Sequence, residues 1–204
     1  VGTGAVSSTA TATVEYVMLT DDFTGTIIDT NKWVETDTGG DGGTVGNVQQ
    51  NGSLTVANSE SGTDEGLNAL VSVDSFDDNG LELSAKITSN GGLPLFGYGD
   101  RQWNLAGNKA YIIYISGSTL MGLTWHYGAM TNSNTSCGTY TAGATYTMKI
   151  ISTGFEVYKD DVLQCTVTPG DGNLVDNKSI FLESNGSTAS TYDDVYVTGI
   201  YTEP

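Results

Sequence analysis

The stretch TDDFTGTIIDTNKW, residues 20–33, combines an acidic pair, an aromatic ring, a turn and the first tryptophan of the chain. Asp21 and Asp22 stand directly before Phe23, and Trp33 closes the stretch. Outward from it, apolar and polar residues alternate along the 204-residue chain, and no helical period is found. This alternation is typical of β-strands that have one buried and one exposed face.

Five segments show the alternation most clearly, and turn-forming residues separate them. They are GLELSAKI (80–87), AYIIYIS (110–116), TYTMKIIS (145–152), FEVYKDDVLQCTV (155–167) and YDDVYVTGIY (192–201). In the fourth segment we expect a hairpin whose two-residue turn is Asp160 and Asp161, because aspartate tolerates a positive φ. Glycine is frequent (27) and proline rare (3). The sequence therefore predicts an all-β fold of short strands, arranged as an antiparallel two-sheet sandwich.

The opening stretch resembles the start of concanavalin A-like sandwiches, especially family 16 glycoside hydrolases and laminin G-like domains. The matching residues are Asp21, Asp22, Phe23, Asp29, Lys32 and Trp33. NGSLTVA (51–57), TYTMKIISTGFEVYKDDVLQ (145–164) and TYDDVYVTGIY (191–201) are similar to later strands of the same fold. The resemblance covers about residues 20–201 and implies a jelly-roll sandwich. These motifs belong to the scaffold, which enzymes, lectins and structural modules share.

The catalytic motif of the resembled hydrolases, Glu-x-Asp-x-x-Glu on one strand, does not occur in this sequence. The strand that matches its position reads NKAYIIYIS (108–116) and contains no carboxylate. Other carboxylates in predicted strands are Glu82, Glu156 and Glu183, and most strand glutamates face solvent. Retaining hydrolysis needs two carboxyl groups about 5 to 5.5 Å apart. We therefore expect no catalytic residue and no enzyme activity. A glycoside hydrolase or lyase that uses these other acids is the less favoured alternative.

The resemblance also implies a structural Ca²⁺, held between the opening acidic pair and the closing strand. The matched positions are Asp22 and Asp194, with Asp21 and Asp193 as neighbours. Calcium prefers six to eight oxygen ligands, which carboxylates and loop carbonyls supply. The loop TDTGGDGGT (36–44), with Asp37 and Asp41, is a second possible oxygen cage. The alternative is that these carboxylates accept hydrogen bonds from their own turns.

A carbohydrate site is expected where aromatic residues gather in the middle of the chain, on strands that form the concave sheet of the resembled proteins. Aromatic rings stack on the apolar C–H faces of sugars. The candidate sugar-binding residues are Tyr98, Asp100, Arg101, Trp103, Trp125 and Tyr127. Core packing is the alternative for each ring, and Tyr111 and Trp125 are the ones for which packing between the sheets is most plausible.

The N-terminal residues 1–19 form a separate segment before the sandwich of residues 20–204. VGTGAVSS (1–8) is small and flexible, and TATATVEYVML (9–19) alternates. Its residues Ala10, Ala12, Val14, Tyr16 and Met18 share one face. Such a strand can be donated to the sheet of a second copy, which predicts self-assembly; pairing with its own closing strand is the alternative.

Charge excludes some partners and points to an extracellular setting. Seven basic residues against 24 acidic ones give a net charge of −17, which repels nucleic acid and anionic membranes. No apolar run is long enough to enter a membrane, and no signal-peptide pattern is found, which is expected for a mature or excised form. Cys137 and Cys165 form either one disulfide or two buried thiols. Four glycosylation sequons (Asn51, Asn134, Asn177, Asn185) fit a secreted or surface-exposed protein of a cell or virion.

The expected function is thus a non-catalytic surface structural or adhesive subunit whose partners are copies of itself. A lectin-like carbohydrate-binding module is the alternative, with glycans as partners.

Overall fold

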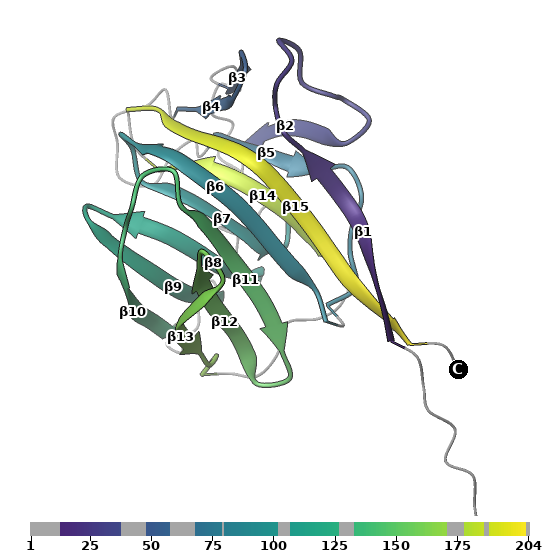
Figure 1. The fold of residues 1–204 in the computed structure, drawn as a ribbon, viewed down its shortest axis with the longest axis vertical. Helices are drawn as coiled ribbons and strands as arrows, with labels where there is room; N and C mark the ends of the chain where they lie inside the picture. Colours follow the sequence, from purple (N-terminus) through teal and green to yellow (C-terminus); the bar gives the residue numbers. More distant parts are fainter. Residues whose placement is uncertain are drawn as a thin grey trace, which may run out of the picture.

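A computed structural model describes residues 13–37, 48–57, 68–78, 80–101, 107–126, 133–170, 178–185 and 188–202, and the structural statements below refer to these residues. They form two antiparallel sheets that pack face to face (Figure 1). The predicted jelly-roll sandwich is confirmed. In the described part of the chain no helix is long and apolar enough to cross a membrane.

The first sheet has eight strands in the described residues. In order they are β13 (Val162–Val167), β12 (Gly154–Lys159), β11 (Thr145–Ile151), β6 (Glu82–Asn90), β15 (Ser190–Thr202), β4 (Leu54–Val56) and β3 (Val48–Gln50), with β1 (Thr13–Asp21) also beside β15. The second has seven: β10 (Ser133–Thr139), β9 (Thr119–His126), β8 (Lys109–Ser116), β7 (Pro94–Gly99), β14 (Ser179–Ser184), β5 (Asn68–Ser72) and β2 (Trp33–Asp37). The main core lies between them.

The hairpin of β12 and β13 forms as predicted. Asp160 and Asp161 have φ angles of 48° and 62°, which is the left-handed conformation that a two-residue hairpin turn requires. The Asp160 carboxylate also accepts a hydrogen bond from the N–H of Thr145, 3.0 Å away. Local turn chemistry therefore fixes this corner of the first sheet.

The opening stretch joins the two sheets. The indole N–H of Trp33, in β2, donates to the Asp21 carboxylate at the end of β1 across 2.9 Å. The other oxygen of Asp21 accepts from the N–H of Phe23 at 3.0 Å. The Phe23 and Trp33 rings are buried, with their centroids 6.0 Å apart. Asp21 is thus part of the sequence motif that predicted the fold, and its side chain also holds a core tryptophan in position.

The N-terminal strand pairs with the same chain's closing strand, along a register from Thr13 opposite Thr202 to Asp21 opposite Val195. Residues 13–19 of the predicted donor strand thus pair within the chain, which is the alternative that the sequence left open, and donation to a second copy stays a prediction. β1 runs past residue 19, so the predicted boundary at 19/20 falls inside a strand.

The predicted shared face of β1 is present where the structure describes it. Tyr16 and Met18 both lie over Gly199, where an added Cβ would be 3.7 Å from Tyr16 Cζ and 2.4 Å from Met18 Cε. The Val14 side chain and residues 9–12, with Ala10 and Ala12, lie outside the described structure.

A disulfide joins Cys137 and Cys165, whose Cα atoms are 5.0 Å apart. Cys137 belongs to β10 and Cys165 to β13, and each strand is the last one of its sheet. The bond therefore closes one side of the sandwich by linking the two edges. Of the two alternatives that the sequence left open, the structure has the bridge.

A buried tyrosine, Tyr192, connects the sheets through its hydroxyl. It donates to the carbonyl of Leu95 at 2.9 Å and is also hydrogen-bonded to the carbonyl of Glu183. Burial raises the pKa of Tyr192 well above its ordinary value of 10.0, and the charge of Glu183 adds to this. The folded state therefore holds this proton more tightly than the unfolded chain does.

Tyr192→Phe is expected to lower the free energy of unfolding near neutral pH by about 1 to 3 kcal/mol, because the buried carbonyls of Leu95 and Glu183 lose the single hydroxyl proton that they share. Above pH 10 the unfolded chain releases the Tyr192 proton first, so wild-type stability falls as pH rises, by up to about 1.4 kcal/mol per pH unit from this group. Urea unfolding at pH 7 to 11 measures both effects. An equally steep alkaline loss in the variant would contradict the assignment to Tyr192.

Candidate functional site

The outer face of the seven-stranded sheet carries a second apolar cluster, separate from the core between the sheets. Its buried members are Ala69, Val71, Leu95, Ala110, Ile112 and Phe181, and Leu93, Tyr114, Leu123 and Trp125 pack against them while partly exposed. On an exposed sheet face these positions would ordinarily be polar. An apolar outer face with partly exposed aromatic rings is a candidate binding surface.

The strand registers arrange this face in three rows, because residues paired across antiparallel strands point to the same side. The rows are Trp125–Ala110–Gly99–Ser179, then Asn134–Leu123–Ile112–Gly97–Phe181–Val71–Val34, then Ser136–Met121–Tyr114–Leu95–Glu183–Ala69–Thr36. Each row crosses the sheet at a right angle to the strands.

In the first row, the indole ring of Trp125 is followed by two positions with small or no side chains, Ala110 and Gly99, which we call the low platform. A Cβ added to Gly99 would come within 2.5 Å of the Ala110 Cβ, so the backbones approach too closely for a larger residue. In the next row a Cβ on Gly97 would be 2.6 Å from the Phe181 ring. Side chains are therefore small or absent at Ala110, Gly99 and Gly97, and the Trp125 ring lies next to Ala110 in the first row.

Two polar groups of this face have defined positions. The Tyr114 hydroxyl donates to the Asn134 side-chain oxygen at 3.0 Å, and Asn134 is exposed. Glu183 lies in the same row as Tyr114 and is fully buried. In the three described rows it is the single carboxylate. Tyr114 belongs to the central group of aromatic residues in the sequence but is not among the predicted sugar-binding residues, and Asn134 is predicted only as a glycosylation sequon. The alternation of β8 would have placed Tyr114 on the face opposite Tyr111.

The predicted sugar-binding residues separate into three groups. Trp125 lies on the outer face, where it packs against the second apolar cluster, and not between the sheets. Tyr98 is wrong as a sugar-binding residue, because its ring is fully buried between the sheets and its hydroxyl donates to the Phe76 carbonyl at 2.7 Å. Tyr111 is likewise in the core, 5.1 Å from the Phe155 ring. Trp103 and Tyr127 lie outside the described residues.

Asp100 and Arg101 follow β7 at one end of the same face. Asp100 pairs with Lys178 and accepts a hydrogen bond from the N–H of Lys109 at 2.8 Å. Its carboxylate thus links the end of β7 to the start of β8 and to Lys178. Arg101 is exposed, and its guanidinium donates to the carbonyls of Ser72 and Val73 at 3.2 Å each.

Glu82 and Glu156, the other two strand glutamates considered as catalytic acids, are on the outer face of the other sheet. Glu82 pairs with Lys149, and Glu156 accepts a hydrogen bond from the Tyr158 hydroxyl at 2.6 Å. The hydrogen bond that Lys149 donates to Glu82 is the main cause that raises the pKa of Lys149. On β8 the outward positions are Ala110, Ile112 and Tyr114, and all three lack an acidic group.

The predicted calcium ligands have other partners. The Thr24 N–H and hydroxyl donate to Asp22 at 3.1 and 2.9 Å, and these hydrogen bonds hold the pKa of Asp22 below its ordinary value. Lys86 lies 3.3 Å from both Asp193 and Asp194, and its hydrogen bonds to Asp194 and Asp193 raise the pKa of the lysine. An ammonium between these carboxylates does not fit an oxygen cage for Ca²⁺.

No group of three or more metal-ligating side chains occurs among the residues that the structure describes. Asp41 of the second proposed cage lies outside them, and the Asp37 side chain is not described. Calcium binding by this chain stays a prediction.

Comparison with known proteins identifies the fold. No family model matches the sequence, and no curated protein matches it. Among solved structures, β-agarase A from Zobellia galactanivorans has a TM-score of 0.68 at 14% identity, covering 94% of both chains. The catalytic domain of an endo-1,3-β-glucanase from Thermotoga petrophila has a TM-score of 0.64 at 14% identity, covering 95% of this chain and 100% of its own. The two sheets of this chain therefore have the same overall fold as these glycan-degrading enzymes.

The β-glucanase of Bacillus licheniformis is similar as well, with a TM-score of 0.62, 14% identity and coverage of 88% of this chain and 96% of its own. At such identities the likeness establishes the concanavalin A-like sandwich, and the function has to be argued from the residues of this chain.

Proposed function

We propose that this protein is a non-catalytic carbohydrate-binding domain that holds a glycan on the outer face of its seven-stranded sheet. The observation that carries the proposal is the partly exposed Trp125 beside the low platform of Ala110 and Gly99. A sugar ring that stacks on the indole would lie next to these two positions, which have little or no side chain of their own. The Asn134 amide, bonded to Tyr114, supplies a polar group next to this apolar surface.

The solved structures with this fold support a glycan as the ligand, since they are named as glucanases and agarases. One of them, β-agarase A, was solved in complex with oligoagarose. The absence of catalysis is proposed because β8 presents Ala110, Ile112 and Tyr114 outward, and one buried carboxylate, Glu183, cannot form the pair that retaining hydrolysis needs. The disulfide supports a location outside the cell or on a cell or virion surface.

Trp125→Ala is expected to weaken binding of the best glycan at least about tenfold, since the stacking surface is lost. A glycan array identifies the ligand, and calorimetry measures its affinity for both proteins. Tyr196→Ala is the matched control, because Tyr196 is an exposed aromatic residue on the other sheet and its loss should leave the affinity unchanged.

Two results would contradict the proposal. One is a chain that binds no glycan, or binds it equally well after Trp125→Ala. The other is release of reducing sugars by the wild-type protein from the glycan that it binds, which would show that the domain is an enzyme.

A surface structural or adhesive subunit is the second candidate function. It is favoured by exposed apolar side chains on edge strands. These are Tyr16 and Val17 on β1, Val34 on β2 with Val73 beside it, and Val162 and Leu163 on β13. Open edges with apolar side chains promote pairing between chains.

A further inference from the structure

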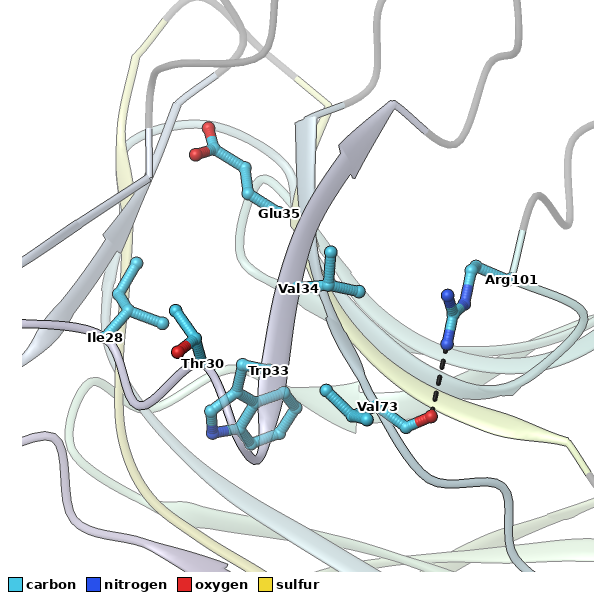
Figure 2. Close-up of a pocket in the computed structure, with 7 residues that line it drawn as sticks. All are labelled: Ile28, Thr30, Trp33, Val34, Glu35, Val73 and Arg101. Carbon is cyan, nitrogen blue, oxygen red and sulfur yellow. Dashed lines mark hydrogen bonds between the residues drawn. The ribbon is translucent and has the colours of Figure 1, made fainter.

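A groove of about 470 Å³ crosses the edge strand β2. It is lined by Ile28, Thr30, Trp33, Val34, Glu35, Val73 and Arg101. Figure 2 shows Val73 and Arg101 on one side of β2, and Ile28, Thr30 and Glu35 on the other. The groove therefore spans both sides of a sheet edge. A cleft that receives an added strand needs this shape, because alternate side chains of the added strand point to opposite sides of the sheet.

The backbone of β2 is available for such pairing. In the described residues β2 pairs only with β5, and the Val73 N–H donates to the Lys32 carbonyl at 2.8 Å. Hydrogen-bonded and non-bonded pairs alternate in an antiparallel ladder. Val34 therefore directs its main-chain groups toward β5, and the N–H and C=O of Glu35 face the open edge.

The side chains define what the added strand should carry. On the inner side, the Glu35 carboxylate has a buried oxygen, Oε1, without a hydrogen-bond donor in the described structure. A buried acceptor of this kind costs about 1 to 3 kcal/mol until a donor reaches it. On the outer side, Val34 and Val73 are 36% and 42% exposed and offer apolar contact. The matching strand has hydroxyl donors on one face and small apolar side chains on the other.

Residues 9–12 of the chain itself have this pattern, with Thr9 and Thr11 on one face and Ala10 and Ala12 on the other. Residues 1–12 contain no charged side chain, so a molecule with a net charge of −17 does not repel them. We propose that residues 9–12 of one copy add as a strand to the open edge of β2 in a second copy, with the threonines toward Glu35 and the alanines toward Val34 and Val73.

Distance favours a second copy over the same chain. β1 runs from Thr13 to Asp21, which contacts Trp33 in β2. Thr13 is therefore roughly 26 Å from the groove, at about 3.3 Å per strand residue. A 12-residue segment spans at most about 40 Å, and most of that would be used to run back along β1. A second molecule brings its segment to the groove without this detour.

The contact is head-to-tail, so each copy has one donor strand and one acceptor groove, and wild-type chains should form rings or filaments. Val34→Lys blocks the acceptor only. Ala10→Pro with Thr11→Pro blocks the donor only, because proline removes the N–H groups that a ladder needs. Each variant alone is expected to sediment as the 21.4 kDa monomer, whereas an equimolar mixture should form dimers of twice this mass.

Val162→Lys is the matched control, because it places the same charge on another exposed edge valine, in β13, and should leave assembly as in the wild type. Circular dichroism checks that each variant folds, and Val73→Lys provides a second acceptor variant. Two results would overturn the proposal. One is a wild type that stays monomeric at every concentration of a series that spans about 100-fold, and the other is a mixture of the two variants that forms no dimers. Neither readout depends on glycan binding.

Discussion

Trp33→Ala is expected to lower the free energy of unfolding by about 4 to 5 kcal/mol. Truncating a buried aromatic residue ordinarily costs about 3 to 5 kcal/mol. Here the Trp33 side chain is almost fully buried against Phe23, and its indole also satisfies Asp21. The substitution therefore creates a cavity and removes a hydrogen bond to a charged group that joins the two sheets.

Urea unfolding measured by circular dichroism quantifies this effect. Trp33→Phe keeps a smaller aromatic ring and removes the N–H donor, so it should cost less than Trp33→Ala, by an amount that reflects the part of the ring that remains. Val34→Ala, at the exposed neighbouring position of the same strand, is the control and should cost less than about 1 kcal/mol. Equal stability of Trp33→Ala and Val34→Ala would show that the opening stretch does not stabilise the fold.

Replacing Cys137 and Cys165 together with serine is expected to cost about 3 to 4 kcal/mol. The bond closes a loop of 28 residues, and the entropy of that loop in the unfolded chain sets this magnitude. The bond also links β10 and β13, the edge strands on one side of the sandwich. Its loss therefore leaves that side held by packing alone.

Thermal unfolding with and without a reducing agent tests this prediction. The wild type should lose about as much stability on reduction as the double variant loses by substitution, and the variant itself should not respond to the reducing agent. A wild-type melting temperature that does not change on reduction would mean that the disulfide contributes nothing to stability.

The fold was predictable because its signals are local. Asp160 and Asp161 form the expected turn, and the alternation along residues 110–116 and 145–152 corresponds to β8 and β11. The pairing of residues 137 and 165 was not predictable, since a disulfide depends on a Cα separation that only the packed sheets define.

The candidate site was predicted less well, because both faces of the seven-stranded sheet are apolar. Alternation places Tyr111 and Tyr114 on opposite sides of β8 but does not show which side is the core. Tyr98 was assigned to the wrong face for this reason. The contact of Lys86 with Asp193 and Asp194 joins positions more than 100 residues apart, and no local pattern reports it.

The register of β1 on β15 places Thr13 directly opposite Thr202. Paired residues in an antiparallel ladder have Cα atoms about 4.5 to 5.5 Å apart, so the chain enters and leaves the sandwich at nearly one point. Joining these ends with a short linker and cutting a surface turn elsewhere would give a circular permutant with the same strand order in space. For the same reason the whole sandwich can be inserted into one surface loop of a host protein. The two ends of the host loop would then be separated by little more than the width of two strands.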